Sequence, residues 1–326
     1  VLLIFKRLRI YKPSYSAMNI AVLSILFGNT ASIFMNFYFG HGLTAILLLA
    51  TYYSYMKKAH FKVGLFYGLT LLSDYSSALF LPIFITLYLW SYRKDLVWIK
   101  PFLIGGIIPG ALWVWYHSMS FGSPFNIPNM FQNPRFQDVA VEGQTLWGIF
   151  HLTFPVRVLK ELLFGMHRSI LITQPWIYFV LIFTPFYIIK NKGDKTVTQL
   201  YFFCLTGLFL LLMMNVHFGG WHGGSTSGPR YLSAILPLFG VLLLLIYDFF
   251  SRSIKAVLWS SLIGSLIFRV LVYGSTALAP EKDNLWSSLL EVMLKQGNKG
   301  ITRSIIMMSL LILVGFFQYK RAKRLP

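Results

Sequence analysis

Ten apolar stretches divide this chain of 326 residues, at 15–35, 41–56, 61–73, 76–92, 101–117, 171–189, 199–216, 231–250, 256–274 and 301–318. A transmembrane helix needs about 20 consecutive apolar residues, so a chain of this length has room for about ten. Only 12% of the residues are charged, about half the share found in soluble domains. The sequence therefore predicts an all-α, polytopic transmembrane bundle of about ten spans, forming a single domain over residues 1–326. A soluble enzyme of several domains is excluded.

The positions of the charges predict the orientation of this bundle. The chain has 29 Lys and Arg against 10 Asp and Glu. If the ten stretches alternate across the membrane, most bases fall in one set of connections, near 6–12, 57–62, 93–100, 190–195, 252–255 and 320–324. The positive-inside rule makes that set cytoplasmic, and with it both termini. The basic excess thus indicates topology and attraction for anionic lipids, and we expect no nucleic-acid partner.

A polar break separates the stretches 61–73 and 76–92, at Ser73, Asp74 and Tyr75. The first stretch is short for a full crossing, so a tilted or re-entrant pair also fits. One continuous span over 61–92 would invert the later topology and move the basic loops outside, so the charges favour the break. Asp74 then lies at the outer side or in a wet cavity. An ionisable residue at such a depth is a functional candidate by default.

Three connections on the outer side are long enough to hold a site: 118–170, 217–230 and 275–300. The first ends in an apolar stretch around 159–166, which predicts an amphipathic helix in the membrane interface with Lys160 and Glu161 facing water. We expect the loops 118–170 and 217–230 to meet over one cavity that opens sideways to the outer leaflet. The chain begins with Val1, so we expect an N-terminal part to be missing.

The sharpest motif is glycine-rich and runs from His217 to Tyr231, with five glycines in fifteen residues. Glycines let backbone N–H groups approach an anion closely, and Arg230 supplies a planar fork that matches phosphate. Pro229 fits the first turn of a helix over 231–250, whose positive dipole end faces the same point. The motif predicts a phosphate site. A flexible surface turn, with Arg230 anchored among lipid headgroups, is the alternative.

Other residues are weaker candidates. His167 and Arg168 offer a second cation, although an interfacial Arg is equally an ordinary membrane anchor. His41 opens the stretch 41–56 at a depth comparable to Asp74, but a lone His is often a packing residue. His217 and His222 lack a third ligand, and the single cysteine, Cys204, excludes a disulfide framework or a cysteine zinc cluster. No nucleotide fingerprint occurs, so we expect neither a metal nor a cofactor.

Several short motifs together carry a resemblance to a known family. They are, in chain order, His41 at the start of a stretch, 121–125 (FGSPF), 162–164 (LLF) before His167 and Arg168, 221–224 (WHGG), 228–232 (GPRYL) and Pro237. Over roughly residues 25–240 this order resembles bacterial integral-membrane glycosyltransferases of the GT-C superfamily. These are related to the protein O-mannosyltransferases and to the lipid A aminoarabinose transferase.

The resemblance implies a reaction and a set of site residues. Such enzymes move a sugar, with inversion, from a polyprenyl-phosphate carrier to a lipid, glycan or protein acceptor at the outer face of the membrane. For this chain it implies the bacterial inner membrane and a carrier-binding site formed by His41, His167, Arg168, Trp221, His222, Arg230 and Tyr231. The family's catalytic acid follows its first span, and this chain begins beyond that point. The base then comes from the missing part or from Asp74, Asp138, Glu142 or Glu161, or activity is lost.

Two other classes of function remain open. A lipid-linked-sugar transporter or flippase would also need many spans and a site for the carrier lipid. It would have to be accessible from both sides of the membrane, and no paired broken halves indicate inverted repeats. A catalytically inactive membrane scaffold subunit is the third possibility, because the acidic outer loop is not in the chain.

Overall fold

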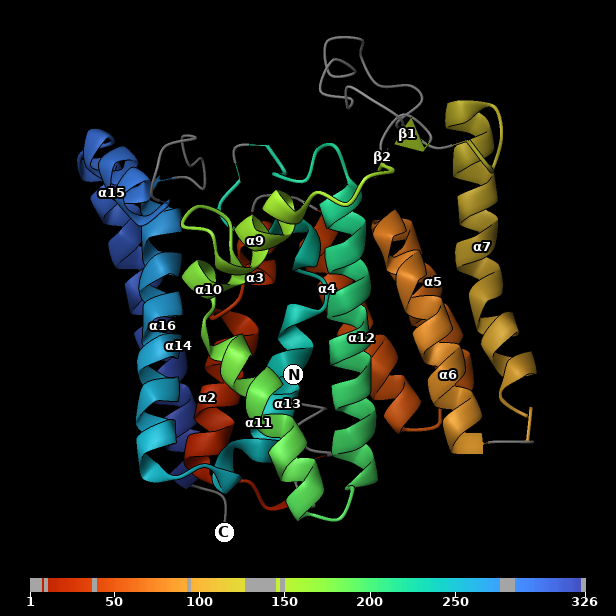
Figure 1. Cartoon of the computed structure of the whole chain (residues 1–326), viewed down its shortest axis with the longest axis horizontal. Coiled ribbons are helices and arrows are strands. Elements are labelled where there is room, and N and C mark those ends of the chain that lie inside the picture. The colour runs from red at the N-terminus through yellow and green to blue at the C-terminus, as the bar shows by residue number, and fades with distance from the viewer. Residues whose placement is uncertain are drawn as a thin grey trace.

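The protein is a bundle of α-helices in which each of the ten apolar stretches is helical (Figure 1). The computed structural model describes residues 8, 11–36, 40–92, 95–126, 145–146, 150–224, 226–275 and 285–323. The longer helices are α2 (Tyr15–Leu26), α4 (Gly40–Met56), α5 (His60–Ser73), α6 (Phe80–Tyr92), α7 (Ile99–Phe121), α9 (Val156–Phe164), α11 (Trp176–Lys190), α12 (Lys195–His217), α13 (Leu236–Ile246), α14 (Arg252–Ser275), α15 (Leu285–Lys295) and α16 (Asn298–Lys323). Shorter elements are α3 (Ala31–Asn36), α10 (Ile170–Thr173), the 3-10 helices η2 (Tyr75–Leu79), η4 (Arg230–Leu232) and η5 (Tyr247–Phe249), and the strands β1 (Thr145–Leu146) and β2 (Phe150–His151).

The structure confirms an all-α bundle whose apolar helices are typical of a membrane protein, but it does not show about ten spans. In the described part of the chain, four helices are long and apolar enough to cross a membrane: η2 continued by α6, then α7, α12 and α14. A fifth crossing results if α15 and α16, which meet at 118°, count as one broken span. The shortfall arises because other stretches fold into short helices, such as α2 with 12 residues and α13 with 11. Helices of that length reach only about 18 Å.

The connections fall at two opposite ends of the bundle (Figure 1). The chain leaves α7 and α12 at one end, where β2, α9 and α15 also lie; we name this the loop end. The turns between α11 and α12 and between α13 and α14 lie at the other end, the base end. The described parts of the loops predicted to be outer therefore share one end of the molecule, and the basic segment Lys190–Lys195 lies at the other.

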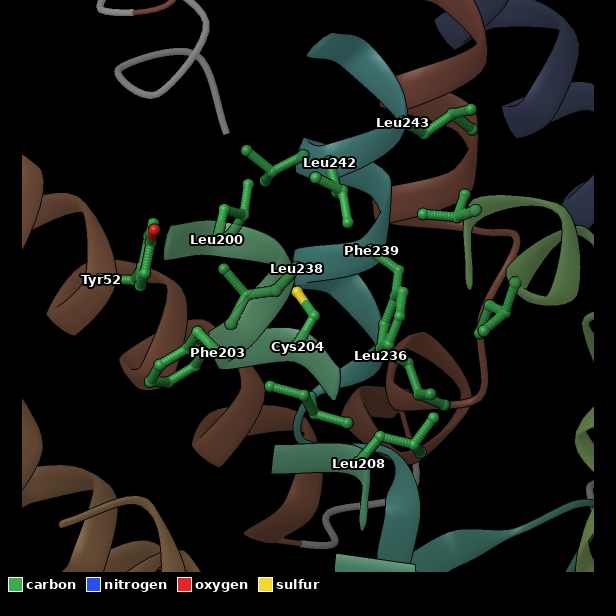
Figure 2. Packing of buried hydrophobic residues seen from close by; sticks show 14 of the residues in the cluster. Tyr52, Leu200, Phe203, Cys204, Leu208, Leu236, Leu238, Phe239, Leu242 and Leu243 are labelled. Atoms are coloured by element: carbon green, nitrogen blue, oxygen red, sulfur yellow. The ribbon is translucent and has the colours of Figure 1, made fainter. Parts of the chain in front are cut away.

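Helix α13 forms the centre of the core. All eleven of its residues are buried, and a helix that is apolar on every face is expected in the interior of a bundle. Figure 2 shows Leu238 of α13 beside Cys204 of α12, and Leu236 and Phe239 belong to the same buried cluster. The core thus fixes the position of the segment that precedes α13, which carries Arg230.

Two local predictions need correction. The amphipathic helix is present, with Val158 and Leu162 buried, but it begins at Val156 rather than near residue 159. The helix predicted over 231–250 is interrupted: η4 covers Arg230–Leu232 and α13 begins only at Leu236. Pro237 lies in the first turn of α13, where its missing N–H costs nothing. Pro229 and Arg230 therefore do not form the N-terminus of α13.

Candidate functional site

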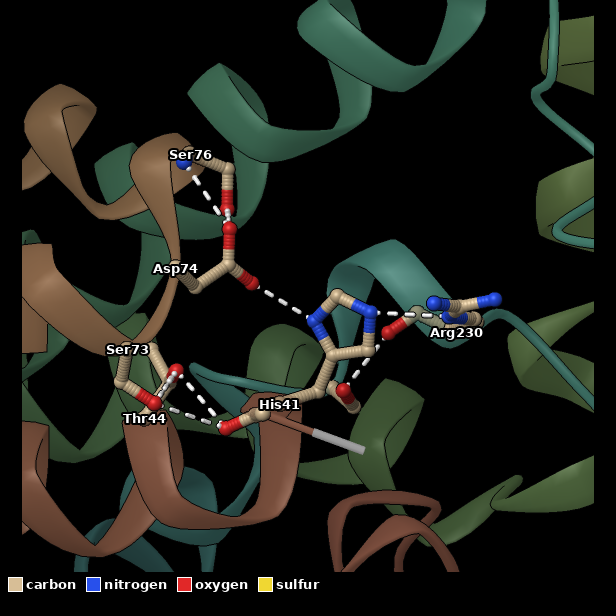
Figure 3. A network of polar contacts seen from close by, with 8 residues as sticks. His41, Thr44, Ser73, Asp74, Ser76 and Arg230 are labelled. Carbon is tan, nitrogen blue, oxygen red and sulfur yellow. Dashed lines mark hydrogen bonds and ion pairs between the residues drawn. The ribbon is translucent and has the colours of Figure 1, made fainter. Parts of the chain in front are cut away.

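Asp74 lies at the predicted break between two helices, and its carboxylate is held from both sides (Figure 3). Helix α5 ends at Ser73, and Asp74 caps the following 3-10 helix η2. Its Oδ1 accepts hydrogen bonds from the backbone N–H and the hydroxyl of Ser76, at 2.9 and 2.8 Å. Its Oδ2 lies 2.6 Å from Nδ1 of His41. The break in the apolar pattern thus provides a carboxylate with both oxygens engaged.

His41 reaches Asp74 because the first turn of α4 lies against the last turn of α5. A Cβ atom on Gly40 would stand 2.6 Å from the carbonyl oxygen of Ser73, so only glycine allows this approach. The hydroxyl of Ser73 joins the two helix ends, because it donates a hydrogen bond of 3.0 Å to the carbonyl of Gly40 and lies 3.0 Å from the hydroxyl of Thr44. The glycine before His41 thereby places the imidazole beside Asp74.

Arg230 completes a chain of three side chains. Its Nε donates a hydrogen bond of 2.8 Å to Nε2 of His41. A guanidinium only donates, so Nε2 of His41 must be the unprotonated nitrogen and Nδ1 must carry the proton that is donated to Asp74. The imidazole is therefore neutral and lies between a carboxylate and a guanidinium. Figure 3 shows the three side chains in this order.

The network is shielded from solvent. The side chains of His41 and Asp74 are 11% and 14% exposed. Burial raises the pKa of Asp74, but the hydrogen bonds from His41 and Ser76 outweigh it and hold the pKa below the ordinary carboxyl value. Asp74 is therefore ionised at neutral pH. The opposite charge of Arg230 lies across the imidazole.

Aromatic rings enclose the imidazole. Phe34 and Tyr231 meet His41 edge to face, with ring centroids 5.9 and 5.6 Å away. The guanidinium of Arg230 lies 5.4 Å from the ring centroid of Tyr231, within the range of a cation–π contact. Of the predicted site residues, the structure thus brings together His41, Asp74, Arg230 and Tyr231.

The glycine-rich turn connects Arg230 with Arg168. Arg168 is buried and donates to the carbonyl oxygens of His222 and Gly224. Nη1 of Arg230 lies 3.4 Å from the carbonyl oxygen of Gly223. Both arginines therefore hold one turn, and the loops 118–170 and 217–230 meet at the loop end, as predicted. The sideways-opening cavity between them stays a prediction.

The remaining candidates lie apart from the network or serve the turn. Nδ1 of His222 accepts from the backbone N–H of Gly224 at 3.1 Å, and Trp221 packs against the apolar core. His167 is half-buried between α9 and α10. Glu161 lines a surface hollow with Arg157 and Lys160 on α9. Asp138 and Glu142 lie outside the described residues.

Two groups that support these residues, Ser76 and Gly40, were not predicted from the sequence. Ser76 bonds Asp74 through two atoms, and Gly40 allows the helix contact. An Asp followed two residues later by Ser at a helix break is a recognisable capping signal. The role of Gly40 has no comparable signal in the sequence.

The described residues and the comparisons with known proteins give no further guide to the site. Among the described residues, no group of three or more His, Cys, Asp or Glu side chains is arranged to hold a metal ion. Comparison with protein-family models, with curated proteins and with solved structures gives no match. The site is therefore interpreted from its own geometry.

Proposed function

We propose that this protein is a membrane glycosyltransferase that moves a sugar from a polyprenyl-phosphate carrier to a lipid, glycan or protein acceptor. In this proposal the loop end faces the outer side of a bacterial inner membrane, and both termini are cytoplasmic. The short helices complete about ten crossings together with the residues that flank them. The coincidence of an apolar bundle with a polar network at its loop end supports this assignment.

The observation that carries the proposal is the orientation of Arg230. His41 fixes the Nε side of its guanidinium, and Asp74 fixes the imidazole in turn. As the bond between the anomeric carbon and the carrier oxygen breaks, that oxygen retains the electron pair and the phosphate becomes more negative. A preorganised guanidinium stabilises such developing charge without reorganising during the reaction. Arg230 is therefore assigned to the carrier phosphate.

We assign Asp74 to positioning His41 rather than to taking the acceptor's proton. Both oxygens of Asp74 already accept hydrogen bonds, and its lowered pKa makes it a weak base. The proton passes to another carboxylate, for which the sequence candidates are Asp138, Glu142 and Glu161 of the loop 118–170 or a residue of the part expected to be missing. Arg168 supports the site by holding the glycine-rich turn.

The test measures sugar transfer by the purified protein with a set of polyprenyl-phosphate-linked hexoses and pentoses. We expect Arg230→Ala to lower transfer by roughly 10²-fold, the effect of removing one such transition-state contact. Arg230→Lys keeps the charge but loses the planar fork, so an intermediate rate is expected. Arg157→Ala, at an exposed position of α9, is the matched control and should transfer normally.

Thermal unfolding of each variant separates catalysis from folding. The assignment is wrong if Arg230→Ala transfers sugar at a near-normal rate, or if its loss of transfer is explained by unfolding. Failure of the unmodified protein to transfer sugar from any of these donors would contradict the proposed reaction. If the network serves only to join α4, η2 and η4, variants of its residues would lose stability without a specific loss of sugar transfer.

A further inference from the structure

A second site candidate is an apolar groove on the flank of the bundle. It has a volume of about 680 Å³, and its walls come from α2, α3, α4, α5, α13, α14 and α16. Leu49, Tyr53, Pro237 and Leu310 are typical lining residues. Its volume lies in the ordinary range of small-molecule sites. The groove shares no residue with the Asp74–His41–Arg230 network.

The groove opens toward the side of the bundle. Three lining side chains at its rim, Met35, Ile46 and Leu310, are 47%, 45% and 45% exposed. They belong to α3, α4 and α16, and all three are apolar. In a bundle that crosses a membrane, such a rim faces hydrocarbon rather than water. A ligand would therefore enter from the lipid.

One buried cation lies in the wall of this groove. Arg269 of α14 is 2% exposed, and its Nη2 donates to the backbone carbonyl of Ser32. Its guanidinium lies 4.9 Å from the ring centroid of Tyr273. Nε and Nη1 of Arg269 have no hydrogen-bond partner among the described residues. An arginine inside a membrane bundle is costly and usually faces a partner or a ligand path.

We propose that the groove binds one anionic membrane lipid, whose phosphate accepts hydrogen bonds from Arg269 and whose apolar chain lies along α4 and α16. The charge and the planar donors of Arg269 match a phosphate. The lining is mostly apolar and matches a hydrocarbon chain, and its few polar residues include a second cation, Lys62. The site is independent of the proposed sugar transfer.

Native mass spectrometry of the delipidated protein in detergent tests the ligand class. Phosphatidylglycerol is the probe, diacylglycerol lacks the phosphate, and inorganic phosphate lacks the chain. We expect one molecule of phosphatidylglycerol to bind. The other two compounds should bind at least about tenfold more weakly, because diacylglycerol cannot accept hydrogen bonds from Arg269 through a phosphate and inorganic phosphate has no chain to fill the groove. Inorganic phosphate binding as tightly as phosphatidylglycerol would overturn the proposal in favour of a simple anion site. Equal binding of diacylglycerol would exclude the role of Arg269.

Two variants test the place of binding. Arg269→Gln removes the charge, and Leu310→Trp fills the groove while leaving Arg269 unchanged. We expect each to weaken phosphatidylglycerol binding at least about tenfold, as expected for the loss of one charged hydrogen bond or of the chain site. Arg252→Gln, exposed on the same helix, and Ile312→Trp, 68% exposed on α16 and outside the groove, are the controls.

Leu310→Trp keeps the proposal testable if Arg269→Gln does not fold. Leu310 lies at the rim, so a larger side chain can be accommodated there without disturbing the core. Normal phosphatidylglycerol binding by Leu310→Trp would overturn the proposal regardless of Arg269→Gln. Weakened binding by Leu310→Trp but not by Ile312→Trp supports it.

Discussion

Nε2 of His41 accepts a hydrogen bond of 2.8 Å from Nε of Arg230, although the two residues lie 189 positions apart in the chain. This bond sets the tautomer of the imidazole, because the nitrogen that faces a guanidinium cannot carry a proton. The other nitrogen must then donate to Asp74, which is the geometry that the structure shows. One neutral ring thus connects a buried anion with a cation and joins three separate segments of the chain.

Removing the ring should destabilise the fold. In His41→Ala, Asp74 and Arg230 each lose a hydrogen bond to the imidazole while remaining largely shielded from water. We expect the free energy of unfolding to fall by about 2 kcal/mol or more, since each buried group left unsatisfied costs about 1–3 kcal/mol. Unfolding in detergent measures this. His60→Ala is the control, because the hydrogen bond of His60 in the described part of the chain goes to the neutral hydroxyl of Tyr88. An equal or larger loss there would contradict the interpretation.

Asp74 should make the stability depend on pH. Its pKa is lowered in the folded state, so its contribution is complete above the pKa of the unfolded carboxyl, about 3.9. The contribution is lost as the pH falls through the lower folded pKa. We expect the unmodified protein to lose more stability than Asp74→Asn when the pH is lowered below about 4. Unfolding temperatures across this pH range provide the measurement. Parallel pH curves for the two proteins would show that Asp74 does not titrate in this way.

Gly223 and Gly224 form a matched pair that isolates the position of Arg230. Both have positive φ, +68° and +73°, so alanine is strained at either position. A Cβ on Gly223 would also lie 3.1 Å from Oγ1 of Thr226 and 3.3 Å from Cβ and Cδ of Arg230, whereas a Cβ on Gly224 meets nothing within 4 Å. We expect Gly223→Ala to lower sugar transfer at least about tenfold more than Gly224→Ala, because misplaced catalytic groups are costly. Equal transfer rates would remove the link between this turn and the reaction.

Cysteine labelling can test the orientation of the two ends of the bundle. Cys204 is the single cysteine and is buried, so the unmodified protein should label poorly. We expect Phe125→Cys and Thr153→Cys, at the loop end, to react with a membrane-impermeant maleimide in intact cells. Lys57→Cys and Asn191→Cys, at the base end, should react only after permeabilisation. The reverse pattern would invert the proposed topology, and labelling of all four in intact cells would argue against a membrane boundary between the ends.

The helices and their breaks were predictable because they depend on local composition. Each apolar stretch is helical, and the polar residues around Asp74 end α5 where the pattern predicts. The amphipathic character of α9 could also be predicted from the spacing of its apolar residues. Among the described residues four or five helices, rather than about ten, are long enough to cross a membrane alone, because a polarity pattern does not show how long each continuous helix is. The start of α13 is an example: Pro237, rather than Pro229, lies in its first turn.

Residue patterns along the chain were enough to predict an apolar helical bundle and to select His41, Asp74, Arg168 and Arg230 as candidates. Which of these side chains lie together depends on the tertiary fold. Arg168 holds backbone carbonyls of the turn, whereas Arg230 reaches an imidazole on another helix. Contacts of this kind depend on close packing between distant segments, such as the approach of α4 to α5 that Gly40 permits. A residue pattern along the chain indicates local structural preferences, but it does not show which helix ends lie against each other in the folded protein.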